Sequence, residues 1–64
     1  MITIVRHVKL GEGFACVVTD SCTGNSYLQK YTIDSTCRTM MIEEHLFHSE
    51  IKSCRIFDSV YKGK

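Results

Sequence analysis

The fold is decided by residues 14–20, which read FACVVTD. In an extended chain successive side chains point to opposite faces, so Phe14, Cys16 and Val18 share one face and the alternate residues share the other. Every residue from 14 to 18 is apolar or small, so both faces are suited to burial. The segment therefore predicts a strand in the interior of a sheet, with a neighbouring strand on each side.

Two further extended segments flank this one, and turn residues join them to it. In residues 1–10 the apolar side chains fall on one face, interrupted by Arg6: Ile2, Ile4, Val8 and Leu10. Gly11-Glu12-Gly13 suits a short hairpin loop, and residues 20–26 (DSCTGNS) form a dense cluster of turn residues. Residues 26–33 alternate again. Because the connections are too short for parallel crossovers, residues 2–33 predict a three-stranded antiparallel meander.

The second half of the chain predicts a helix followed by a strand. Residues 38–50 have a helix-favouring composition, with Glu43 and Glu44 near the expected N-terminus, although the apolar stripe is poorly formed and a strand stays open as the alternative. Residues 51–61 alternate and predict a fourth strand. The expected order is β-β-β-α-β, a single small α+β domain over residues 1–64 with one helix packed on an antiparallel sheet.

The apolar strand residues outnumber what one helix can cover. Four of them are expected on one face of the sheet: Val5, Ala15, Val17 and Leu28. Six are expected on the other: Ile2, Ile4, Phe14, Val18, Tyr31 and Ile33. A second apolar face predicts self-association or a partner, and a homodimer formed by edge pairing or sheet packing fits this pattern.

Composition excludes several classes of protein. The chain has 64 residues, a formal net charge of +1 and no apolar run of the ~20 residues that a membrane span requires. The opening residues, MITIVRH, lack the apolar stretch of a signal peptide, so we expect a cytoplasmic protein. The near-zero charge does not by itself recruit nucleic acid or an anionic membrane.

The four cysteines are expected to be unpaired thiols. Cys16 and Cys54 fit small core residues on strands, and Cys22 and Cys37 fall near loops. A disulfide framework is the alternative, which an extracytoplasmic or hyperthermophilic source would favour. The sequence alone does not decide between free, disulfide-bonded and metal-bound cysteines.

The strongest cluster for metal chemistry is Cys37, His45, His48 and Cys54, which offers two thiols and two imidazoles. On a helix His45 and His48 would face the same way, but the spacing C-x7-H-x2-H-x5-C matches no established zinc pattern. No catalytic signature surrounds any cysteine or serine, and a chain of this size has little room for a water-excluded pocket. We therefore expect no metal, no cofactor and no enzymatic activity.

Two binding functions remain. Met40, Met41 and Phe47 are adaptable apolar residues of the kind found at protein interfaces. The first hypothesis is a non-enzymatic regulator or inhibitor that binds protein, of the kind that phages and mobile elements carry.

The alternative is a small RNA- or DNA-binding regulator whose sheet would present these residues: Arg6, Lys9, Tyr27, Lys30 and Tyr31. Residues 1–7 resemble the first strand of the small dimeric carbon-storage-type RNA regulators. The expected C-terminal half differs from the five strands and tail of that family, so no function is carried over.

Overall fold

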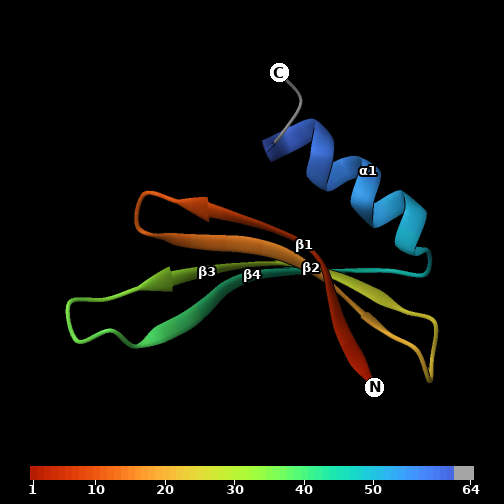
Figure 1. Ribbon diagram of the computed structural model, residues 1–64, viewed down its shortest axis with the longest axis horizontal. Coiled ribbons are helices and arrows are strands. Elements are labelled where there is room, and N and C mark those ends of the chain that lie inside the picture. Colours follow the sequence, from red (N-terminus) through yellow and green to blue (C-terminus); the bar gives the residue numbers. More distant parts are fainter. Residues whose placement is uncertain (62–64) are drawn as a thin grey trace.

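The computed structural model describes residues 1–61, which form a four-stranded antiparallel sheet and one helix. The strands are β1 (Ile2–Leu10), β2 (Gly13–Asp20), β3 (Ser26–Ile33) and β4 (Thr39–Phe47), and the helix is α1 (Glu50–Tyr61). The sheet order is β1-β2-β3-β4, and the helix lies on one side of this twisted layer (Figure 1). Among residues 1–61, no helix has the length and apolar character needed to cross a membrane.

The predicted meander over residues 2–33 is confirmed, and so is the interior position of β2. At the β1–β2 turn, a Cβ on Gly13 would overlap the carbonyl oxygen of Tyr31 and come within 2.8 Å of the Cα of Thr32. Only glycine allows β3 to approach this closely. The backbone N–H of Ile33 then donates to the carbonyl oxygen of Glu12 at 2.8 Å, which ties the turn to β3.

Turn chemistry joins β2 to β3 as the sequence predicts. The Asp20 carboxylate accepts a hydrogen bond from the backbone N–H of Cys22 at 2.9 Å, an Asx-type turn. The N–H of Gly24 donates to the carbonyl oxygen of Asp20 at 2.8 Å, and Gly24 has φ of 77°, a conformation that costs glycine little. These contacts fix the hairpin and therefore the β2–β3 register.

The expected element order in the second half is wrong, because the chain forms β-β-β-β-α rather than β-β-β-α-β. Residues 39–47 are not a helix but the edge strand β4, which pairs with β3 from Ser26↔Phe47 to Ile33↔Thr39. As a helix this segment would leave one edge of β3 unpaired, whereas as a strand it satisfies the backbone groups of that edge. This long-range pairing outweighs the helix propensity of its side chains.

Residues 50–61 are a helix rather than the expected fourth strand. The Ser49 hydroxyl caps it by accepting a hydrogen bond from the backbone N–H of Lys52 at 3.3 Å, and Glu50 complements the positive end of the helix dipole. The helical period brings Cys54 and Phe57 to one buried face, whereas strand alternation would place them on opposite faces. Burial of Phe57 therefore favours the helix.

The core lies between α1 and one face of the sheet. It comprises a small buried cluster and the half-buried residues around it: Ala15, Val17, Cys54 and Phe57, with Val5, Val8, Leu10, Leu28 and Tyr61. The expected face for Val5, Ala15, Val17 and Leu28 is confirmed by this cluster.

The expectation that the apolar residues of β1 share one face is wrong. The register shifts between Ile4 and Arg6, so Ile4 pairs with Val18 and Arg6 pairs with Val17. A β-bulge adds one residue to the strand and so exchanges its faces. Ile2 and Ile4 therefore lie on the face away from α1, whereas Val8 and Leu10 lie on the helix side. The sequence also predicts a solvated tail at residues 62–64, and that segment lies outside the described residues.

Candidate interaction face

The side of the sheet that faces away from α1 is called the open face here. The strand registers align its residues in three rows, each crossing β1, β2, β3 and β4 in that order. The rows are Ile4, Val18, Tyr27 and Leu46; His7, Cys16, Gln29 and Glu44; and Lys9, Phe14, Tyr31 and Met41. Among residues 1–61, no helix or strand packs on this face.

The open face is apolar where water-facing strands are ordinarily polar. An antiparallel sheet with one solvated face shows alternation of apolar and polar residues, with the polar side outward. Here Ile4 is 61% exposed and Leu46 is 50% exposed, while Val18 and Cys16 are already buried among their neighbours. Ile2 and Ile33, which the sequence also predicts on this side, are exposed as well. Apolar residues gathered on one exposed face are typical of an interaction surface.

Three rings stack across the open face. The ring centroids of His7 and Phe14 are 5.2 Å apart, and those of Phe14 and Tyr31 are 4.8 Å apart with the planes inclined by 18°. These distances lie in the range in which aromatic pairs attract one another beyond their burial. The stack holds the rings in place before any partner binds, so a partner would immobilise few additional rotamers.

The polar row at the centre of the face is hydrogen-bonded within the chain. The Gln29 side-chain oxygen accepts from the Tyr31 hydroxyl at 2.8 Å and from the Cys16 thiol at 3.8 Å. Its amide nitrogen donates to the Glu44 carboxylate at 2.8 Å. Burial raises the pKa of both Tyr31 and Cys16, and for Tyr31 the nearby Cys16 and Glu44 add to the effect. Both groups therefore stay protonated near neutral pH.

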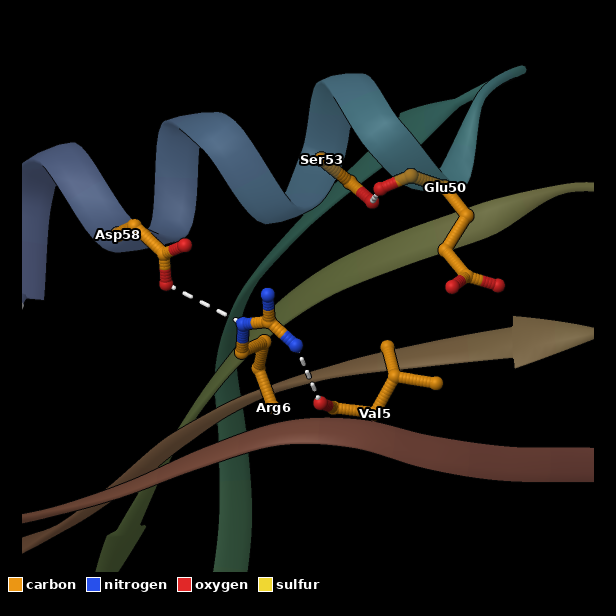
Figure 2. Close-up of polar contacts among 5 residues, drawn as sticks. All are labelled: Val5, Arg6, Glu50, Ser53 and Asp58. Atoms are coloured by element: carbon orange, nitrogen blue, oxygen red, sulfur yellow. Dashed lines mark hydrogen bonds and ion pairs between the residues drawn. The ribbon is translucent and has the colours of Figure 1, made fainter.

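The opposite face is occupied by the helix and by a polar contact at its margin. Figure 2 shows the Arg6 guanidinium between the helix and β1, where its Nε donates to the Asp58 carboxylate at 3.2 Å and Nη1 donates to the carbonyl oxygen of Val5 at 3.0 Å. The hydrogen bond to Asp58 is the main reason that the pKa of Arg6 is raised. Within α1, the Ser53 hydroxyl donates to the carbonyl oxygen of Glu50 at 2.9 Å (Figure 2). Arg6 is thus engaged in docking the helix.

The residues named for nucleic-acid binding are divided between the two faces. Lys9, Tyr27 and Tyr31 lie on the open face. Arg6 contacts the helix, and Lys30 pairs with Ala15 on the helix side of the sheet. The structure therefore brings together the two tyrosines and one cation, but not the basic strip that the sequence suggests.

The residues named for a protein interface are also separated. All three lie on β4 rather than on a helix. Met41 pairs with Tyr31 on the open face, Met40 pairs with Thr32, and Phe47 lines a hollow beneath α1. Only Met41 therefore belongs to the open face.

The residues named as a metal cluster do not meet. Cys37 lies in the β3–β4 loop with φ of 64°, and Cys54 is buried on α1. His45 lies on β4, and His48 Nδ1 is 3.1 Å from the side-chain oxygen of Asn25. Within residues 1–61, no three histidine, cysteine, aspartate or glutamate side chains lie close enough together to hold a metal ion.

The cysteines are distributed largely as the sequence predicts. Cys16 and Cys54 are buried, Cys22 and Cys37 are exposed, and all four are free thiols. The one correction is that Cys54 lies on α1 rather than on a strand.

Two hollows flank the helix, which sequence reasoning missed. One, of about 270 Å³, lies between α1 and the β3–β4 pair and is lined by Leu28, Phe47 and Ile56 among others. The other, of about 480 Å³, lies near the C-terminal end of α1 and is lined by Leu10, Ile42 and Tyr61 among others. The sequence analysis expected a strand over residues 51–61, whereas both hollows are lined in part by residues of the helix found there.

In comparisons with known proteins, no family model matches the chain, and neither a curated protein nor a solved structure gives a significant match. The function is therefore inferred from the residues and their geometry.

Proposed function

We propose that this protein is a small non-enzymatic regulatory module that acts in the cytoplasm by binding protein through its open face. The observation that carries the proposal is the apolar and aromatic character of that face, opposite the side on which the helix forms the core. A face of this composition gains free energy when a partner removes it from water, at about 25 cal/mol per Å² of apolar surface. Two of its polar residues, Gln29 and Glu44, are already hydrogen-bonded to each other.

The charges on the open face favour protein over nucleic acid. Lys9 and His7 lie on β1, and the carboxylate of Glu44 lies on β4 at the far edge of the same face. A nucleic-acid surface would gather several cations to neutralise phosphates. Because Arg6 is paired with Asp58 on the other side of the sheet, it does not add to Lys9.

The state of the thiol on this face supports a non-enzymatic role. Cys16 is the one cysteine on the open face, and burial raises its pKa, which disfavours the thiolate. A nucleophilic cysteine requires the opposite, a lowered pKa beside a cation or a general base. The Cys16 thiol instead keeps its proton and donates a hydrogen bond to the side-chain oxygen of Gln29 at 3.8 Å.

The test uses two positions on β4 that are matched in exposure. Leu46 lies on the open face, and Ile42 is the bulged residue that lines the hollow near Tyr61; each is 50% exposed. A photo-crosslinking amino acid replaces each residue in turn, in cells that naturally make the protein. We expect position 46 to capture polypeptide and position 42 to capture much less.

A second measurement separates the two classes of partner. The purified protein is titrated against RNA and DNA at low and at physiological salt, because contacts to phosphate weaken steeply as salt rises. Crosslinks from position 46 to nucleic acid, together with salt-sensitive binding that Tyr31→Ala abolishes, would replace the proposal with the nucleic-acid alternative. Equal capture of protein at positions 46 and 42 would also overturn it.

A further inference from the structure

We propose that the partner of the open face is a second copy of this chain, related by a two-fold axis that runs parallel to the strands between β2 and β3. This inference rests on the proposed function, because it assigns the occupant of the same face. The resulting dimer would have four layers, with the two sheets face to face at the centre and a helix outside each. Area, strand edges and charge each support this arrangement.

The open face is large enough for a specific but modest interface. Strands of eight or nine residues, at about 3.4 Å per residue and ~4.8 Å between strands, give a face of roughly 27 Å by 19 Å, or about 500 Å². Two such faces bury roughly 1,000 Å², which is the lower bound for a specific protein interface. We therefore expect a reversible dimer whose population depends on protein concentration.

The edges of the sheet are less suited to pairing than its face. β1 carries a bulge between Ile4 and Arg6, and β4 carries one where Ile42 has no partner between Met41 and Glu43. Bulges interrupt the row of backbone donors and acceptors that an incoming strand would need, and they are a common protection of edge strands. Both edges have this protection, while the open face has none.

The proposed axis places apolar residues against apolar residues. Rotation about a line parallel to the strands sets β1 over the partner's β4 and β2 over the partner's β3, without exchanging the rows. Ile4 then faces a second copy's Leu46, Val18 faces Tyr27, and Phe14 faces Tyr31. Two twisted sheets packed in this way are inclined by about 30°, so contacts near the axis are direct and those at the edges are slightly displaced.

The same axis places opposite charges together. His7 and Lys9 lie on β1, and Glu44 lies on β4 in the same row as His7. Each Glu44 carboxylate therefore faces His7 of the other copy, and the long Lys9 side chain of that copy approaches it from the neighbouring row. The alternative two-fold axis, which runs across the strands, would set the Glu44 carboxylates of the two copies against each other. Like charges brought together in a desolvated interface oppose association, so the charge pattern selects the axis parallel to the strands.

The polar row at the centre of the interface tolerates burial. Gln29 has both its side-chain oxygen and its amide nitrogen hydrogen-bonded, to Tyr31 and Glu44 respectively. Covering this row therefore leaves both the oxygen and the nitrogen of the Gln29 amide with a partner, which reduces the desolvation penalty of its burial. The remaining unmet requirement is a cation for Glu44, and the second copy supplies it.

Sedimentation of the purified protein tests the partner. We expect a mass that rises with concentration from the 7.3 kDa of one chain toward twice that value. Leu46→Glu should weaken the dimer by at least about tenfold, because it buries a carboxylate against apolar Ile4. The matched variant Ile42→Glu lies off the open face and should leave the dissociation constant within about twofold.

Charge reversal tests the axis. Lys9→Glu alone should weaken the dimer, because it sets glutamate against Glu44, and Glu44→Lys alone should do so by setting lysine against Lys9. Mixed in equal amounts, the two variants should form a heterodimer that is tighter than the homodimer of either variant, because each pair of residues 9 and 44 is then opposite in charge or native. Both substituted residues lie at exposed positions, and circular dichroism verifies that each variant is folded.

The outcomes separate this inference from the proposed function. A mass that stays at 7.3 kDa at all concentrations overturns the second copy, while protein capture at position 46 would still uphold the binding function. A dimer that Ile42→Glu weakens as much as Leu46→Glu overturns the use of the open face. Failure of the mixed charge variants to associate overturns the proposed axis.

Discussion

Phe57 is the residue on which the docking of α1 depends most. Its side chain is fully buried, and its ring lies 5.0 Å from that of Tyr61, between the helix and the central strands. Replacing it with alanine removes most of the aromatic side chain and leaves a cavity that a thin core cannot close. We therefore predict that Phe57→Ala causes the largest loss of stability among single core truncations.

The magnitude follows from burial. Truncation of a buried phenylalanine costs about 3–5 kcal/mol, which combines the lost transfer free energy with the cavity left behind. A domain of this length has a total stability of roughly 3–10 kcal/mol. Phe57→Ala should thus leave much of the protein unfolded at room temperature. Phe57→Leu keeps most of the volume and should cost only about 1–1.5 kcal/mol.

The assay is urea unfolding followed by far-ultraviolet circular dichroism at one fixed protein concentration, since self-association would add to the apparent stability. Ile51→Ala serves as the control, because Ile51 lies on the same helix and is 73% exposed. We expect that control to change the free energy of unfolding by no more than about 0.5 kcal/mol. A loss below about 1 kcal/mol for Phe57→Ala would refute the position of the helix on the sheet.

Three further predictions concern the ends of the elements. Gly13→Ala should destabilise the protein by about 2 kcal/mol or more, because a Cβ would overlap the carbonyl oxygen of Tyr31; thermal melting measures the loss. Ser49→Ala should cost about 1 kcal/mol by removing the cap on the N–H of Lys52, as measured by urea unfolding. The pKa of the Asp34 carboxyl is lowered from its ordinary value of 3.8, chiefly because the Thr36 hydroxyl donates a hydrogen bond to it. The ionised carboxylate should therefore stabilise the fold fully above pH 3.8, and this stabilisation should be lost as the pH falls through the lower pKa of the folded state. The stability difference between the wild type and Asp34→Asn, measured by acid titration, should therefore shrink only below about pH 4.

Each of these has a control and a result that would contradict it. Gly11→Ala is the control for Gly13, because a Cβ at Gly11 meets no atom within 4 Å; equal losses at both positions would contradict the close approach of β3. Ser49→Asp retains a capping oxygen and should remain near wild type, so a loss like that of alanine would contradict the cap. For Asp34, a carboxyl pKa at or above 3.8, followed by nuclear magnetic resonance, would contradict the hydrogen-bonded loop.

The thin core and the open face have one physical cause. A single helix of twelve residues covers one side of a four-stranded sheet only in part, and the other side has no cover among residues 1–61. The chain nevertheless carries apolar residues on both faces of β2. Covering the second face would shelter Ile4, Leu46 and their neighbours, so association and folding stability should be coupled.

The sequence by itself determined the three-stranded meander and the presence of apolar residues on both faces of the sheet. Alternation over residues 14–20 was sufficient to place β2 in the interior, and the glycines and Asp20 marked its two turns. The expected division of apolar residues, with Val17 on one face and Val18 on the other, matches the strand register. These features are local, because a period of two and turn chemistry depend only on neighbouring residues.

The sequence therefore predicted that a second apolar face exists, but it did not show which residues of the four strands form that face. The tyrosines could be placed together because both lie at odd positions of one strand, whereas Lys30 falls on the other face for the same reason. Met40, Met41 and Phe47 do not lie together on the open face, because they belong to a strand rather than to the expected helix and their relative positions differ accordingly. The ring stack joins three strands, so no single segment reveals it.

Only the tertiary structure decided the identity of the last two elements and the faces of β1. Residues 39–47 became a strand because the free edge of β3 offered backbone partners, and residues 50–61 became a helix because Cys54 and Phe57 then meet one buried surface. The bulge at Val5 turned Ile4 and Val8 to opposite sides, which alternation alone cannot show. In each case contacts between distant segments outweighed the weak preferences of the local sequence, because burial and backbone pairing contribute more free energy than intrinsic propensity does.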